Sequence, residues 1–151
     1  MPAIFFDTSA LVKRYDPAEH GADRVRSLCR RAPDSTALIA RVTPIEVASA
    51  LNRKRREGRL DVAKRDQLWR LFRAHWRHQY RTIAMDEAVW GDAQRLLFAY
   101  PLRAYDAVQL ASALRVAAVL ADLTTDVRLC TADQAQAAAA DGEGLRVELV
   151  D

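Results

Sequence analysis

The sequence has few of the residues that interrupt regular structure or cross-link a chain. Its 151 residues include 5 glycines, 5 prolines and 2 cysteines. Scarce glycine and proline favour regular helices and strands, while Cys29 and Cys130 form neither a zinc-ligand spacing nor a disulfide framework. No apolar run approaches the roughly 20 residues that a membrane-spanning helix needs, and the first residues lack the pattern of a secretory signal. We therefore expect a cytoplasmic protein that does not enter a membrane.

Length and composition fit one globular domain. Residues 1–151 suffice for a sizeable core and leave little room for a second domain. Half of the residues are hydrophobic and 28% are charged, which is typical of globular chains rather than disordered ones. We expect a single domain over residues 1–151.

Short apolar segments alternate with helical patterns along the chain. Strands are predicted over residues 3–6, 36–40, 81–84, 127–130 and 145–149. Helices are predicted to start near residues 8, 17, 43, 61, 86, 104 and 133, with the second running from Pro17 to about Arg31. The alternation predicts an α/β domain with a mostly parallel central sheet covered on both faces. Such sheets bind ligands at the carboxyl ends of their strands.

Four acidic residues lie in apolar or small-residue surroundings, where an unpaired charge is costly. Asp7 follows a predicted strand, Glu46 lies between Ile45 and Val47, Asp106 opens an apolar helix, and Asp133 follows another predicted strand. Carboxylates that converge repel one another unless a cation joins them. The sequence therefore predicts a site for a hard divalent cation at one edge of the sheet.

Mg²⁺ or Mn²⁺ would suit such oxygen ligands. A divalent ion makes a hydroxide available near neutral pH and offsets charge that grows on phosphoryl oxygens, as phosphodiester hydrolysis requires. Each acid also has a plain structural interpretation. Asp7 and Asp133 suit the N-caps of the helices that follow them, and Glu46 and Asp106 suit the positive ends of their helix dipoles.

Positive charge is concentrated in the middle of the chain. Residues 52–81 hold eleven Lys or Arg against three Asp or Glu, although the whole chain has 23 basic and 20 acidic residues. This segment is either a polyanion-binding surface, with Arg53, Lys54, Arg55 and Arg56 as RNA contacts, or a pair of solvated helices.

The histidines and aromatic residues of this region are interpreted as structural. His75 and His78 have no nucleophile or partner motif beside them, which favours surface or packing roles over general-base catalysis. Trp69, Phe72 and Trp76 could stack on bases, but their helical spacing favours the core or a partner interface.

Four segments together resemble one family. They are residues 5–11 (FFDTSAL), 43–51 (TPIEVASAL), 104–114 (AYDAVQLASAL) and 130–133 (CTAD). In this order and spacing they resemble the motifs of PIN-domain ribonucleases, and more narrowly those of the VapC toxins of type II toxin–antitoxin pairs. The resemblance implies a PIN-like α/β/α sandwich, Mg²⁺- or Mn²⁺-dependent hydrolysis of phosphodiester bonds in RNA, a homodimer and a cognate VapB-like antitoxin.

The resemblance also implies residue roles. Asp7 and Asp106 match the main metal ligands, Glu46 the acid that completes the metal shell, and Asp133 a supporting fourth acid. Three hydroxyl residues match positions that hold the acids by hydrogen bonds, namely Thr8, Ser9 and Thr131. The chain departs from the family after Asp133, where relatives often have a basic residue and this sequence has Gln134-Ala135-Gln136.

Other functions stay open at this point. A PIN-domain nuclease could process RNA without being a toxin, and a small antitoxin gene directly upstream would separate the two. A non-catalytic nucleic-acid-binding module would not need four acids facing phosphate. A phosphatase with an aspartyl nucleophile is disfavoured, because Asp7 is followed by Thr8-Ser9 without a second acid two residues on.

Overall fold

A five-stranded, entirely parallel sheet forms the centre of the protein. The computed structural model describes residues 2–30 and 35–151. The strand order is β3-β2-β1-β4-β5, so β1 is the central strand and the predicted parallel sheet is confirmed. The strands are β1 (Ala3–Phe6), β2 (Thr36–Ala40), β3 (Tyr80–Ile83), β4 (Val127–Thr131) and β5 (Arg146–Leu149).

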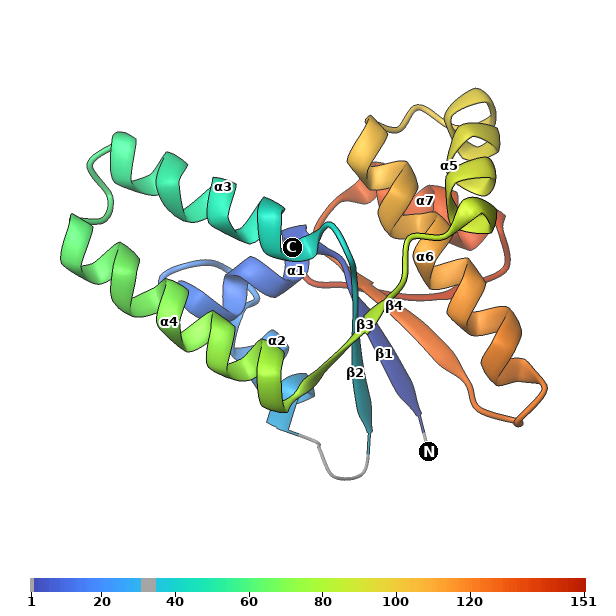
Figure 1. Cartoon of the computed structure of the whole chain (residues 1–151), viewed down its shortest axis with the longest axis horizontal. Coiled ribbons are helices and arrows are strands. Elements are labelled where there is room, and N and C mark those ends of the chain that lie inside the picture. The colour runs from blue at the N-terminus through green and yellow to red at the C-terminus, as the bar shows by residue number, and fades with distance from the viewer. Residues whose placement is uncertain (1, 31–34) are drawn as a thin grey trace.

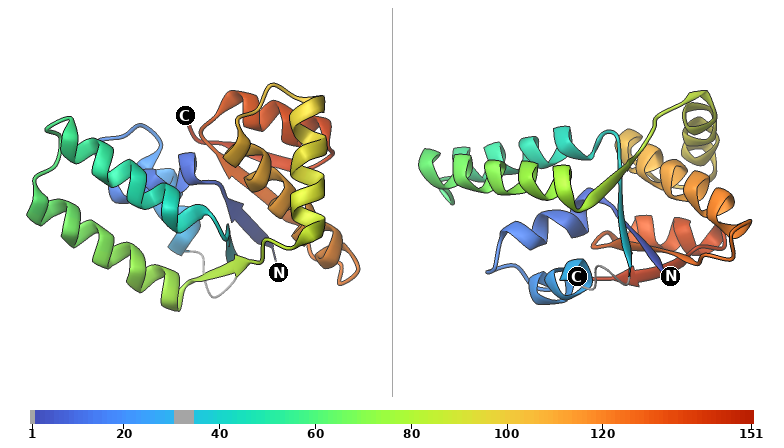
Figure 2. Two further views of the ribbon diagram at one scale, coloured as in Figure 1. Left: turned by 45° about the horizontal axis from the view of Figure 1, so that its top comes forward. Right: turned by 60° about the horizontal axis from the view of Figure 1, so that its bottom comes forward.

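Helices cover both faces of this sheet (Figures 1 and 2). One group of helices packs on the first face: α1 (Thr8–Leu11), the 3₁₀ helix η1 (Val12–Tyr15), α2 (Ala22–Arg30), α3 (Thr43–Arg56) and α4 (Val62–His78). The other group packs on the second face: α5 (Glu87–Ala99), α6 (Ala104–Ala121) and α7 (Gln134–Gly142). The molecule is therefore an α/β/α sandwich.

Alternation along β1 explains why both faces are covered. Successive side chains of a strand point to opposite faces. Ile4 and Phe6 join the core under α1–α4, whereas Ala3 and Phe5 join the core under α5–α7. Both phenylalanines are fully buried, and burial of one such side chain contributes about 1.5–3 kcal/mol. A strand apolar on both faces thus has to lie in the middle of the sandwich.

The aromatic residues of α4 belong to the hydrophobic core between the sheet and α1–α4. Phe72 is fully buried and stacks on Trp69 with ring centroids 5.4 Å apart. Trp76 also packs on Phe72, with ring centroids 6.1 Å apart. The prediction of a packing role is therefore confirmed for these three residues.

Two details of the fold differ from the sequence prediction. The second helix begins at Ala22 rather than at Pro17, because residues 17–21 form turns that end at Gly21 with a positive φ of 85°. Its predicted end at Arg31 lies outside the described residues. The other difference concerns α6, which among the described residues is long and apolar enough to cross a membrane by length and composition. In the fold it packs on α5 and on the sheet.

Candidate active site

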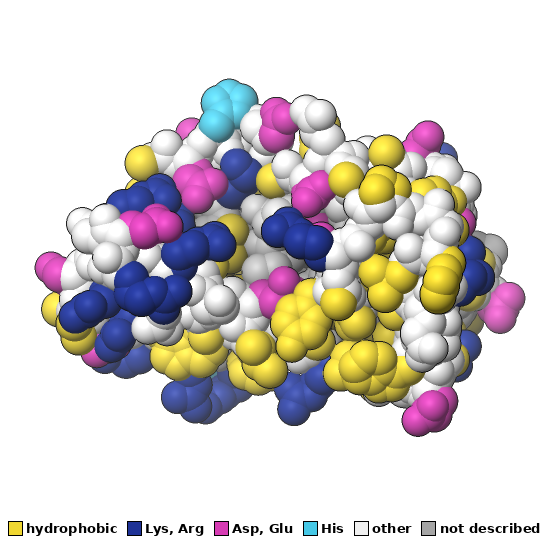
Figure 3. All heavy atoms as spheres, turned by 90° about the horizontal axis from the view of Figure 1, so that it is seen from above, with side chains coloured by type: hydrophobic (Ala, Val, Ile, Leu, Met, Phe, Trp, Pro, Cys, Tyr) yellow, Lys and Arg dark blue, Asp and Glu magenta, His cyan; other side chains and the backbone are white. Residues whose placement is uncertain are grey.

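A cavity opens at the carboxyl edge of the sheet, between α1, the start of α3 and the start of α6. Its volume is about 490 Å³. Seen from above, it is a hollow bordered by acidic and basic side chains near the middle of the face (Figure 3). All four predicted acids line it, together with Thr8, Ser9, Val12, Ile45, Ser49, Ala50, Arg53, Arg103, Tyr105 and Gln109. The fold thus brings together carboxylates that lie up to 126 positions apart in the chain.

Asp7 is the most buried of the four acids, with 3% of its surface exposed. It directly follows β1, and its amide donates to the Cys130 carbonyl at 3.1 Å. Its Oδ1 accepts from the Ser9 hydroxyl (2.6 Å), and its Oδ2 accepts from the Thr131 hydroxyl (2.7 Å). Asp7 is also the N-cap of α1, because Oδ1 accepts from the Ala10 amide. The cap and a role in the cavity are compatible.

The environment of Asp7 disfavours its charged form. Burial raises the pKa of this carboxyl to about 6, against the opposing effect of its hydrogen bonds from Ser9, Thr131 and Ala10. The negative charge of Asp106 contributes to this increase. A positive charge placed between Asp7 and Asp106 would offset both effects.

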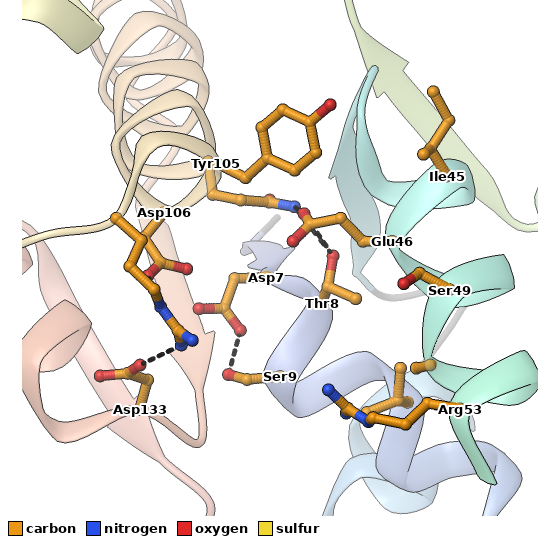
Figure 4. Close-up of a pocket in the computed structure, with 14 residues that line it drawn as sticks. Asp7, Thr8, Ser9, Ile45, Glu46, Ser49, Arg53, Tyr105, Asp106 and Asp133 are labelled. Atoms are coloured by element: carbon orange, nitrogen blue, oxygen red, sulfur yellow. Dashed lines mark hydrogen bonds and ion pairs between the residues drawn. The ribbon is translucent and has the colours of Figure 1, made fainter. Parts of the chain in front are cut away.

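Glu46 lies in the first turn of α3 and points toward Asp7 (Figure 4). Its Oε1 accepts from the Thr8 hydroxyl at 3.0 Å and from the Gln109 amide nitrogen at 2.7 Å. Burial raises the pKa of this carboxyl, and its two hydrogen bonds lower it. Uncharged donors from two other helices therefore hold Glu46 in place.

Gln109 was not among the residues predicted for the site. It is 1% exposed, and its amide nitrogen lies within hydrogen-bond distance of Thr8 Oγ1 (2.9 Å), Thr43 Oγ1 (3.1 Å) and Glu46. Its Oε1 has no partner among the described residues. The available signal was a single amide in an otherwise apolar stretch of α6, which contains Ala107, Leu110 and Ala111.

Asp106 and Asp133 form the more exposed side of the cavity. Arg103 Nε donates to Asp106 Oδ2 at 3.2 Å, and Arg103 Nη2 lies 3.7 Å from Asp133 Oδ2. The arginine is 85% exposed, whereas the two acids are 22% and 26% exposed. Asp133 Oδ1 also accepts a hydrogen bond from the backbone amide of Gln136, so Asp133 is the N-cap of α7. Sequence reasoning missed Arg103, which immediately precedes α6.

The predicted RNA-binding residues separate in the structure. Arg53 lines the cavity, and Figure 4 shows it on α3 on the same side as Ser49. Arg55 and Arg56 are exposed and do not line the cavity. Lys54 is buried, and its ammonium lies 2.5 Å from Asp16 Oδ2 and 3.0 Å from Glu19 Oε1. Its charge is therefore already neutralised within the fold.

The cavity has the donor chemistry for a hard divalent cation. Asp7, Glu46, Asp106 and Asp133 offer only oxygen ligands, which suit Mg²⁺ or Mn²⁺. Among the residues that the structure describes, no histidine or cysteine lines the cavity. Within residues 2–30 and 35–151, however, no three acidic, His or Cys side chains lie close enough together to form a ready-made metal cluster. A cation would therefore have to draw the carboxylates together.

Fold and cavity together define an α/β protein with an acidic pocket at the carboxyl edge of a parallel sheet. A family model described as "PIN domain" matches residues 4–140 of the chain. Because the match covers most of the chain, the protein belongs to the PIN domain family. No curated protein matches the chain in sequence.

Solved structures share the fold at low sequence identity. The VapBC2 complex from Rickettsia felis, bound to a promoter DNA fragment, has a TM-score of 0.64 and 11% identity, covering 99% of both chains. VapC20 from Mycobacterium tuberculosis, described as a sarcin–ricin loop cleaving toxin, has a TM-score of 0.62 and 17% identity over 90% of this chain and 94% of its own. FitAcB from Neisseria gonorrhoeae has a TM-score of 0.61 and 15% identity over 95% of each chain.

Proposed function

We propose that the protein is a metal-dependent endoribonuclease that hydrolyses phosphodiester bonds in RNA. The observation that carries the proposal is the convergence of four carboxylates with two arginines in one cavity at the carboxyl edge of the sheet. A bound Mg²⁺ or Mn²⁺ would supply a hydroxide near neutral pH and offset charge on the phosphoryl oxygens. Asp7 and Asp106 would hold the ion, with Glu46 and Asp133 in support.

The remaining residues of the cavity position these carboxylates and the substrate. Ser9 and Thr131 hold the two oxygens of Asp7, while Thr8 and Gln109 hold Glu46. Such fixed donors maintain the orientation of metal-binding carboxylates. Arg53 and Arg103 lie at the same cavity and would contact phosphate oxygens of the RNA. They would replace the basic residue that relatives often have after the fourth acid.

We further propose that the nuclease is the cytoplasmic toxin of a type II toxin–antitoxin pair, with a VapB-like antitoxin and a homodimer. The structural neighbours VapBC2 and VapC20 support this assignment by fold. Ile45 and Tyr105 support a partner at the cavity, because both line it while 63% and 47% exposed. Apolar side chains exposed beside acids fit an antitoxin segment that carries a basic residue.

RNA cleavage by the purified protein tests the enzymatic proposal. We expect endonucleolytic cleavage of total bacterial RNA with Mn²⁺ or Mg²⁺, none with EDTA, and none by the Asp7→Asn variant in either metal. Sequencing the 5′ and 3′ ends of RNA after expression of the wild type and of Asp7→Asn identifies the cleaved sites. Equal cleavage by wild type and variant would refute the assigned site, and no cleavage of any RNA would refute the activity.

The toxin role has a separate test. Expression of the chain alone should arrest growth, and co-expression of a small protein encoded directly upstream should restore it. A nuclease that processes RNA without a toxin role would cleave RNA but tolerate expression without a partner.

A further inference from the structure

A second cavity, here named the basic pocket, lies between η1, α2 and the middle of α4. Its volume is about 370 Å³, within the range of small-ligand sites. Four cationic side chains line it, Arg14, Arg26, Arg30 and Lys64, and no Asp or Glu of residues 2–30 and 35–151 lines it. It is separate from the carboxylate cavity, since the two share no lining residue.

Few acids neutralise these four cations. Arg14 donates to the neutral Gln79 Oε1 (2.9 Å) and Tyr80 hydroxyl (2.6 Å). Arg26 lies 3.7 Å from Asp23, whose side chain is fully exposed, so this pair is weak. Among the described residues, no carboxylate forms an ion pair with Arg14, and the same holds for the other two cations of the pocket. Four positive charges around one cavity repel one another, and a bound anion would offset this repulsion.

Lys54 is an example of a cation with a structural role in this protein. It is buried and reaches two carboxylates, Asp16 and Glu19. Both acids have lowered pKa values, for Asp16 chiefly through its hydrogen bond with Lys54 and for Glu19 through hydrogen bonds with Lys54 and Lys13 that outweigh its burial. The basic pocket has no such internal partners in the described part of the chain, which distinguishes a ligand site from a structural ion network.

A chain of hydrogen bonds holds one wall of the basic pocket. The Tyr15 hydroxyl lies 2.8 Å from both the Tyr80 hydroxyl and His75 Nδ1, so Arg14, Tyr80, Tyr15 and His75 form one hydrogen-bonded chain. Burial and the charge of Arg14 lower the pKa of His75 to about 4, so this histidine is neutral near pH 7. A guanidinium held in this way is organised before a ligand arrives, which lowers the entropic cost of binding.

Positive charge continues around α4 beyond the basic pocket. A smaller cavity of about 230 Å³ is lined by Arg70, Arg73, Ala74, Arg77 and His78. Successive residues are about 100° apart around a helix, so Arg70, Arg73 and Arg77 lie on a different side of α4 from the pocket residues Leu71 and His75. The cations therefore occupy two sides of α4. An extended polyanion can contact more of them than an isolated phosphate ion can.

We propose that the basic pocket binds backbone phosphates of the RNA substrate at a distance from the carboxylate cavity. The choice of RNA rests on the proposed function, whereas the phosphate chemistry rests on the lining of the pocket. The carboxylate cavity would cut the strand, and the basic pocket would hold a flanking part of the same molecule. This arrangement would select RNAs long or folded enough to reach both sites.

Binding without cleavage tests the proposal. The Asp7→Asn protein is titrated against a fluorescein-labelled 20-nucleotide single-stranded RNA, and anisotropy gives Kd at several KCl concentrations. The double variant Arg30→Gln/Lys64→Gln removes two exposed cations of the basic pocket. The matched control Arg115→Gln/Arg146→Gln removes two exposed cations that pair elsewhere, with Asp86 and Asp126.

The pocket variant should raise Kd about tenfold at 0.1 M salt and reduce the slope of log K against log salt by about 1.4, since each phosphate contact on a single strand contributes roughly 0.7. The control should stay within about twofold of the parent and keep its slope. Equal effects of the two variants, or no effect of the pocket variant, would overturn the proposal.

Inorganic phosphate separates an RNA site from a site for a free anion. Thermal unfolding of the same proteins is recorded with 20 mM phosphate against 20 mM chloride at matched ionic strength. Phosphate should stabilise the parent more than the pocket variant and compete weakly with RNA. Stabilisation by phosphate together with unchanged RNA affinity of the variant would overturn the assignment to RNA.

The basic pocket and the proposed activity can fail independently. Cleavage of RNA by the wild type, with unchanged RNA binding by the pocket variant, would overturn only the pocket. Loss of RNA binding in the pocket variant, with no cleavage by the wild type under any metal, would overturn only the activity.

Discussion

The two sides of the carboxylate cavity balance their negative charge in different ways. On one side, Asp7 and Glu46 are held by hydroxyl and amide donors and have raised pKa values. On the other side, Asp106 and Asp133 face Arg103, an exposed cation from the start of α6. One side is therefore fixed in geometry and short of positive charge, while the other is supplied with positive charge that can move away. The hydrogen-bond donors around Asp7 and Glu46 thus determine the shape of the site, whereas Arg103 offsets its negative charge.

The largest expected effect comes from removing one charge on each side. Asp7→Asn and Asp106→Asn should each lower metal-dependent RNA cleavage by at least about 10²–10³-fold, because both carboxylates would hold the cation. The two variants should differ in stability. Asp7→Asn removes a buried, disfavoured charge and should stabilise the metal-free protein at pH 7, whereas Asp106→Asn should stay within about 0.5 kcal/mol of the wild type. Single-turnover cleavage and urea unfolding measure both quantities, and full activity of either variant would refute its role.

The second prediction concerns the pH dependence of that stability. Asp7 titrates near 3.9 in an unfolded chain and at about 6 in the folded protein. The folded state therefore binds the additional proton between these values, so acidification from pH 7 to pH 4 should stabilise the fold through Asp7 by about 2 kcal/mol. The difference in unfolding free energy between wild type and Asp7→Asn, measured without metal, isolates this contribution. A difference that does not change with pH would contradict the raised pKa.

The third prediction compares two buried glutamines. Gln109 donates to Glu46 on one side of the carboxylate cavity, and Gln136 donates to the backbone of Asp106 on the other side. Gln109→Leu removes a donor from Glu46 and should lower activity by roughly 10–100-fold, as loss of a residue that orients a metal ligand does. The acidic limb of the pH–activity profile should move to higher pH, because the pKa of Glu46 rises when it loses this hydrogen bond.

Gln136→Leu is the matched control for Gln109→Leu. Gln136 is equally buried, but its amide nitrogen donates to the backbone carbonyl of Asp106 at 2.9 Å rather than to a carboxylate. The control should lose stability without the shift in the pH profile. A shift of the same size in both variants would assign Gln109 a merely structural role.

The smallest effect is expected for the exposed arginine. Arg103→Gln should let Mn²⁺ bind to the free protein about two- to fivefold more tightly, because exposed ion pairs contribute about 0.2–1 kcal/mol. Titration calorimetry without RNA measures this directly, with Arg146→Gln as a control for net charge. Weaker Mn²⁺ binding by Arg103→Gln would show that the arginine supports the cation site instead of competing with it.

Local signals in the sequence were sufficient for the strands and for the acids that follow them. Short, mostly apolar segments predicted β1, β2 and β4, and the carboxylates of Asp7 and Asp133 follow two of these segments. Gln109 and Arg103 could not be found in this way. Gln109 contacts residues 63 or more positions away, and no local pattern encodes such contacts. Arg103 and Asp106 have a local i,i+3 spacing, but the contact of Arg103 with Asp133, 30 positions later, leaves no local signal.

The loop before α2 shows the same limit. Pro17 is a normal start for a helix, but Gly21 lies against the Val150 carbonyl, where an added Cβ would come within 2.6 Å of the oxygen. Asp16 and Glu19 are drawn to Lys54 on α3. Contacts between distant parts of the chain therefore delay the helix to Ala22. The same limit explains why Lys54 was predicted to contact RNA. Its ion-pair partners, Asp16 and Glu19, lie about 35 positions earlier and leave no signal in the sequence around Lys54.

The hydrogen bond from Thr131 to Asp7 joins the seventh residue to one 124 positions later. During synthesis, β1 can pair with β2 early, but β4 becomes available only after residues 127–131 have been synthesised. The cavity cannot close on Asp7 before then. An emerging polypeptide thus has its acidic residues in an unassembled form until β4 pairs with β1, and any RNA-cutting capacity would arise only after that step.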